Sequence, residues 1–63
     1  MRDPKRCEVF CKQLAEIWAT EFPDWRFSQL MINIISSCPS DPWFWEEDKM
    51  MDYIKDYAIN LKR

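Results

Sequence analysis

The segment 27–40 carries no charged side chain, although charged residues crowd both sides of it. Its apolar residues recur at steps of three and four, which is the spacing of one face of an α-helix. They are Phe27, Leu30, Met31, Ile34 and Ile35. Ile32 adds a second apolar face, and a helix that is apolar on more than one face is buried on more than one side. We therefore expect a helix over about 26–36, capped by Asp24, at the centre of the core.

An amphipathic segment precedes this central helix. It opens with Asp3-Pro4, where a carboxylate can accept from unpaired amides and proline suits the first helical position. Its apolar residues keep helical spacing and are Cys7, Phe10, Cys11, Leu14, Ile17, Trp18 and Phe22. Pro23 disfavours the helical conformation at Phe22, so we expect this helix to span about 4–21.

A second amphipathic segment follows. Asp41-Pro42 repeats the Asp3-Pro4 signal, and we predict a short aromatic turn over 42–45. Acidic residues crowd the start of the next helix and basic residues its end, an order that the helix macrodipole favours. Its apolar face consists of Met50, Met51, Ile54, Tyr57, Ala58 and Leu61, which predicts a helix over about 47–61.

Residues 1–63 are therefore expected to form a single all-α domain of three helices. A chain of 63 residues buries little surface and needs dense packing or oligomerisation to be stable. Its net charge of −2 argues against nucleic acid, which requires a strongly basic face. No apolar run reaches the roughly 18 residues of a membrane span. The charged start and the odd cysteine count predict a cytoplasmic protein without a signal peptide.

Residue types that are absent exclude several chemistries. The chain has no histidine and no glycine, so histidine-based catalysis, histidine–metal sites and glycine-rich phosphate loops are excluded. The acidic cluster could perform acid–base catalysis or bind magnesium, but negative charge is expected at a helix start. It consists of Asp41, Glu46, Glu47, Asp48 and Asp52. A DNA-reading helix would need more basic groups than Arg26 near the central helix. We expect a non-enzymatic protein without a cofactor.

Three cysteines leave a metal site to be considered. Cys7 and Cys11 are one helical turn apart, and with Cys38 they could supply three thiolates to zinc. Structural zinc sites usually have four cysteine or histidine ligands, most often in turns. Cysteine is also a small hydrophobe that is often buried, and we expect that role here and no metal.

Trp43-Phe44-Trp45 is the most suggestive feature for function. Three consecutive large rings cannot all point inward from a helical turn, so we expect at least one on the surface. The turn is then either a lid on the core or a binding or self-association surface, because aromatic residues dominate interface hot spots. The candidate partner-binding residues are Trp43, Phe44, Trp45, Glu46, Glu47, Asp48, Trp25 and Arg26. For Arg26, we favour an ion pair with an acid of the last helix over a binding role, and stacking on Trp25 or Trp43 is a third alternative.

Short motifs are spread over most of the chain. They comprise Arg2, Asp3, Pro4, Arg6, Trp18, Pro23, Asp24, Arg26, Phe27, Gln29, Leu30, Asn33, Asp41, Pro42, Trp45, Glu47 and Asp48. In combination they resemble a family of short bacterial and phage proteins to which no activity is assigned. The resemblance implies a small cytoplasmic helical protein, encoded either by a bacterium or by a phage. It carries over no catalytic residue.

We thus expect a protein–protein interaction module and, if it is phage-encoded, an inhibitor or modulator of a host protein. A homodimeric structural or assembly protein is the alternative, in which the aromatic residues serve self-association. A metal-binding module built on the cysteines is the weaker alternative.

Overall fold

The computed structural model describes residues 2–61 and confirms an all-α chain. Among these residues it contains three α-helices, a short 3-10 helix and no strand. The elements are α1 (Lys5–Glu21), α2 (Phe27–Ser37), η1 (Pro42–Phe44) and α3 (Glu47–Leu61). Each predicted helix boundary lies within one residue of the observed one, because prolines and apolar spacing mark these ends locally.

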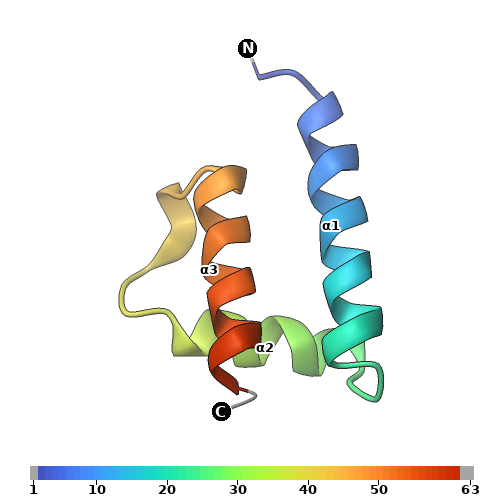
Figure 1. Cartoon of the computed structure of the whole chain (residues 1–63). Coiled ribbons are helices and arrows are strands. Elements are labelled where there is room, and N and C mark those ends of the chain that lie inside the picture. Colours follow the sequence, from blue (N-terminus) through green and yellow to red (C-terminus); the bar gives the residue numbers. More distant parts are fainter. Residues whose placement is uncertain (1, 62–63) are drawn as a thin grey trace.

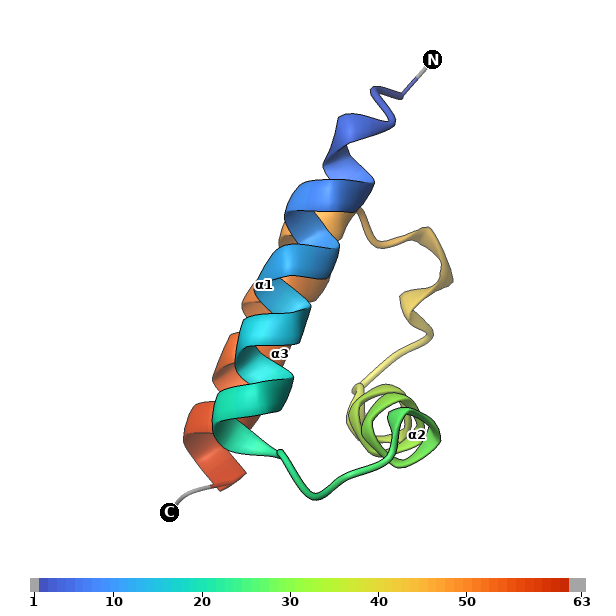
Figure 2. The same cartoon turned by 90° about the vertical axis from the view of Figure 1, so that its right-hand side faces the viewer.

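Helices α1 and α3 lie side by side and run in the same direction, and α2 crosses near their C-terminal ends (Figure 1). Two parallel helices cannot be joined by a short loop. The chain therefore returns along the length of α3 through residues 38–46, which carry η1 (Figure 2). The 15 residues of α3 span about 22 Å. The connecting segment 38–46 can reach roughly 30 Å when extended, so it is long enough to return to the start of α3.

The turn between α1 and α2 is held by hydrogen bonds rather than by glycine. The Trp25 amide donates to the Phe22 carbonyl at 3.1 Å, and the Trp18 indole Nε1 donates to the Trp25 carbonyl at 2.9 Å. The prediction that Asp24 caps α2 is wrong. Arg26 occupies the N-cap position, and its amide donates to Oε1 of Gln29 at 2.8 Å. A glutamine at the third helical position reaches back in this way.

The buried core is small and lies mostly where α2 crosses the other two helices, with Met51 nearer the start of α3. Its members are Phe22, Leu30, Ile34, Met51, Ile54 and Ala58. Leu30 and Ile34 are 0% exposed, which confirms that the uncharged segment supplies the centre of the core. Helix α1 itself has no fully buried residue, because only part of its apolar face is covered.

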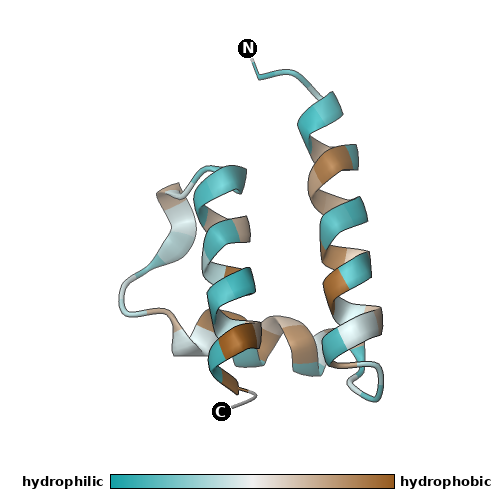
Figure 3. Ribbon diagram, viewed as in Figure 1, coloured by the Kyte–Doolittle hydropathy of each residue, from teal (hydrophilic) through white to brown (hydrophobic). Residues whose placement is uncertain are grey.

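The prediction that α2 is buried on more than one side is wrong. Phe27, Ile32 and Ile35 are 55%, 66% and 47% exposed. Helix α2 lies at the edge of the molecule, so only the side that faces α1 and α3 is covered (Figures 1 and 2). Hydrophobic residues extend along much of α2, whereas hydrophilic and hydrophobic residues alternate along α1 and α3 (Figure 3). Within residues 2–61, no helix has the length and apolar character needed to cross a membrane.

Candidate protein-interaction surface

The aromatic turn, residues 42–45, is held by hydrogen bonds within the chain. The Asp41 Oδ1 accepts from the Trp43 amide at 3.0 Å, and the Trp45 amide donates to the Pro42 carbonyl at 2.9 Å. Pro42 also fixes its own φ angle. The same Asp-Pro device starts α1, where Asp3 Oδ1 accepts from the Lys5 amide at 2.9 Å. Both predicted helix starts are thereby confirmed.

The three rings of the aromatic turn differ in their exposure to solvent. Trp43 is 80% exposed and Phe44 is 89% exposed. Trp45 turns inward, where its ring lies edge-on to Tyr53 at 5.6 Å between centroids. The Lys49 Nζ lies 4.5 Å from the centroid of the Trp45 ring, which is cation–π distance. The prediction that not all three rings can be buried is confirmed, and Trp45 anchors the other two.

A link to α2 further fixes this anchor. The Tyr53 hydroxyl lies 2.7 Å from the Ser37 hydroxyl, and the Ser37 hydroxyl also donates to the Ile34 carbonyl at 2.7 Å. Trp45 therefore packs on a residue of α3 that is itself hydrogen-bonded to the end of α2. The two exposed rings are held by the folded core rather than by a free loop.

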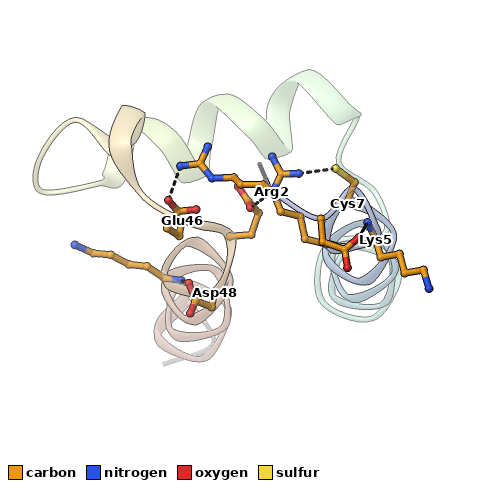
Figure 4. Close-up of polar contacts among 9 residues, drawn as sticks. Arg2, Lys5, Cys7, Glu46 and Asp48 are labelled. Carbon is orange, nitrogen blue, oxygen red and sulfur yellow. Dashed lines mark hydrogen bonds and ion pairs between the residues drawn. The ribbon is translucent and has the colours of Figure 1, made fainter.

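Two of the predicted acidic contact residues are engaged within the chain. The Arg2 Nη2 donates to Glu46 Oε1 at 2.6 Å, and the Arg6 Nε lies 2.7 Å from Glu47 Oε1 (Figure 4). These pairs join the start of α1 to the start of α3 and offset negative charge beside the aromatic turn. Asp48, the third predicted acid, is exposed, and its Oδ1 accepts from the Lys49 amide at 2.9 Å.

Trp25 and Arg26 do not join this surface. They precede α2, whereas η1 follows it at the opposite end (Figure 1), and the 11 residues of α2 span about 16 Å. Trp25 is half-buried and stacks on Phe22 at 4.4 Å between centroids. Arg26 is exposed and forms no ion pair with any residue in 2–61, so the predicted ion pair is not found there. Trp25 is a packing residue.

A pocket of about 280 Å³ adjoins the aromatic turn, between the first half of α1 and the start of α3. We call it the side pocket. It is lined by Arg6, Cys7, Phe10, Cys11, Pro42, Trp45, Glu47 and Met50. The pocket exists because α2 covers only the far ends of α1 and α3. The sequence does not predict the α1 wall as part of a site. Three of its residues, Cys7, Phe10 and Cys11, nevertheless belong to the apolar face predicted for this helix.

Cys7 and Cys11 line the side pocket together, whereas Cys38 does not line it. Cys7 and Cys11 are exposed on α1, which corrects the expectation that they are buried, and Cys38 is half-buried at the end of α2. The Arg6 Nη1 donates to Cys7 Sγ at 3.3 Å (Figure 4), and Cys38 Sγ donates to the Ile34 carbonyl. No group of three or more His, Cys, Asp or Glu side chains within 2–61 is arranged to hold a metal ion.

The cap at Asp41 gives a direct test of how the turn is held. We expect Asp41→Ala to speed hydrogen exchange of the Trp43 amide about fivefold, since losing an N-cap costs about 1 kcal/mol locally. Asparagine keeps an acceptor oxygen, so Asp41→Asn is the matched control and should exchange like the wild type. Amide exchange followed by NMR measures both variants. Equal exchange in the alanine and asparagine variants would show that the carboxylate does not hold the turn.

Comparisons of the chain with models of protein families, with curated proteins and with solved structures found no match. The resemblance to the family of short bacterial and phage proteins therefore stays a prediction. Any functional conclusion rests on the geometry of the aromatic turn and the side pocket.

Proposed function

We propose that this chain is a non-enzymatic protein-interaction module that binds a partner through the aromatic turn. The observation that carries the proposal is the exposure of Trp43 and Phe44, 80% and 89%, on a turn fixed by Asp41 and Trp45. Exposed apolar patches on soluble proteins mark contact sites. Tryptophan in particular is enriched among the residues that dominate binding energy.

The energetics favour a binding role for the two rings. Burying one large apolar side chain contributes about 1.5–3 kcal/mol. In the isolated chain the two adjacent rings stay exposed, so most of this free energy is not gained on folding. Because the turn is already ordered, a partner gains this energy without the entropy cost of fixing a loop. A lid on the core, the other interpretation of the turn, fits Trp45 but leaves the exposed rings without a role.

The ion pairs beside the turn suit an accessory role in this proposal. Arg2 and Glu46 are 65% and 54% exposed in their side chains, and exposed pairs contribute only about 0–1 kcal/mol to stability. A partner can therefore exchange such a pair for contacts of its own at little cost. Glu46, Glu47 and Asp48 would then form a polar rim around the rings, as is usual at interfaces.

The double variant Trp43→Ala/Phe44→Ala tests the proposal. Tagged wild-type chain should capture a partner from host lysate, and the double variant should lose at least about tenfold of that capture, since hot-spot truncations cost more than 1 kcal/mol each. The matched control is Ile32→Ala/Ile59→Ala, which truncates two residues that are also more than half exposed, on α2 and α3. Capture is quantified by mass spectrometry after circular dichroism has confirmed equal helical content.

The outcome is decided by comparing the two double variants. A protein that is lost with Trp43→Ala/Phe44→Ala and retained with Ile32→Ala/Ile59→Ala is a partner of the aromatic turn. Equal capture by both would contradict the proposal. The more specific role, an inhibitor or modulator of a host protein, rests on the resemblance and predicts that the captured protein loses activity when the chain is added.

A further inference from the structure

We propose that the aromatic turn binds a second copy of this chain, with Phe44 of each copy entering the side pocket of the other. This inference rests on the proposed function, because it names the partner of the same surface. The two copies would be related by a two-fold axis, and Trp43 would cover the pocket mouth.

The exposed rings and the side pocket are adjacent along the chain. Pro42 and Trp45 line the side pocket, and the two exposed rings lie between them in the sequence. A two-fold interface uses the same patch on both copies, so that patch must carry both a projection and a matching recess. Here the aromatic turn supplies the projecting rings, and the side pocket supplies the recess.

The pocket has the size and chemistry for an aromatic ring. Its volume of about 280 Å³ exceeds the roughly 150 Å³ of an apolar cavity that admits benzene. Phe10 and Met50 supply apolar walls. The two charges on the wall, Arg6 and Glu47, lie 2.7 Å apart and pair with each other. An entering ring would therefore leave neither charge without a partner, which is the costly outcome in an interface.

The surface available is that of a small, specific dimer interface. Large aromatic side chains bury about 150–250 Å² each, so two rings from each copy supply roughly 600–1,000 Å². The pocket walls that they cover add a smaller area on the opposite side, so the total spans the roughly 1,000 Å² at which specific interfaces begin. Association would also cover part of α1, which has no fully buried residue of its own.

Two complementary variants test the arrangement. Phe44→Ala removes the projecting ring and keeps the pocket. Cys11→Phe fills the pocket from an exposed position on α1 and keeps the ring. Sedimentation velocity over a concentration series should show a wild-type dimer, and each variant alone should dissociate at least about 100-fold more readily, because both symmetric contacts are lost.

Mixing the two variants gives the decisive result. An equimolar mixture of Phe44→Ala and Cys11→Phe should associate about tenfold more tightly than either variant alone, because one ring-in-pocket contact is restored. In the wild type, an isotope-filtered NOE should join the Phe44 ring to the Met50 methyl of the other copy. A mixture that associates no better than its components, or a dimer that survives Phe44→Ala, would overturn the arrangement.

The two proposals fail in different ways. If the wild-type chain is a monomer at every concentration, the second copy is not the partner. If capture of another protein still depends on Trp43 and Phe44, the interaction function stands and only this inference is overturned. If neither association depends on these rings, both proposals are wrong.

Discussion

Replacing Ile34 by alanine is expected to unfold a large fraction of the protein at 37 °C. Ile34 is 0% exposed, and truncating a buried isoleucine to alanine costs about 2–5 kcal/mol. A single core in a chain this short rarely supplies more than about 3–5 kcal/mol. The loss thus approaches the whole stability of the fold. Urea denaturation followed by circular dichroism at 222 nm measures the effect.

Ile32 gives the matched control in the same helix. It is 66% exposed, so Ile32→Ala makes the same chemical change two positions away without opening a cavity. Its effect on the free energy of unfolding should stay within about 0.5 kcal/mol. If the two variants lose equal stability, the orientation of α2 described above is wrong.

Phe22→Ala is expected to have an effect of similar size at the other side of the core. Phe22 is 6% exposed and stacks on Trp25 at 4.4 Å with an interplanar angle of 12°. It also meets the Tyr57 ring edge-on at 6.1 Å. Truncating a buried phenylalanine costs about 3–5 kcal/mol, and the near-ultraviolet circular dichroism of Trp25 should weaken because its stacking partner is gone.

Phe27 is the control for this second prediction. Its ring lies 6.0 Å from that of Trp18, but the residue is 55% exposed. Phe27→Ala should therefore cost about 1 kcal/mol or less, measured by the same urea denaturation. A loss from Phe27→Ala that equals the loss from Phe22→Ala would contradict the packing of the turn between α1 and α2.

Local chemistry explains why the helices could be predicted from the sequence. At Asp3-Pro4 and Asp41-Pro42, the aspartate carboxylate accepts from an amide two residues ahead. Because donor and acceptor are close in the sequence, the helix start can be predicted without knowing the rest of the fold. The observed N-cap of α2 differs from the predicted one because two local interactions compete there. Asp24 is a suitable cap, but Gln29 reaches back to the Arg26 amide and places the helix start later.

The number of neighbours around a helix is not a local property. The period of apolar residues in 27–35 shows which of them share a face, but not whether anything lies against a second face. Because α2 crosses the ends of α1 and α3, Leu30 is buried while Ile32 and Ile35 stay in solvent. The sequence pattern alone could not distinguish this arrangement from a fully surrounded helix.

The candidate site shows the same division between local and distant effects. That Trp43, Phe44 and Trp45 cannot all be buried follows from their being consecutive. The pairing of Arg2 with Glu46 links residues 44 positions apart, and no pattern in the sequence predicts it. The side pocket is also a product of three separate segments. The α1 wall belongs to the site because α1 and α3 run in parallel, and the sequence does not predict this arrangement.

The central claim is that the exposed rings of the aromatic turn are a contact surface. Fluorine NMR of 5-fluorotryptophan-labelled protein tests it most directly, because Trp43 is 80% exposed while Trp18 and Trp25 are half-buried. In dilute protein, the Trp43 resonance should show the largest shift between H₂O and D₂O. On association, with a second copy or a captured partner, that solvent shift should fall while those of Trp18 and Trp25 hold. A Trp43 resonance that keeps its full solvent shift in the associated state would contradict the claim.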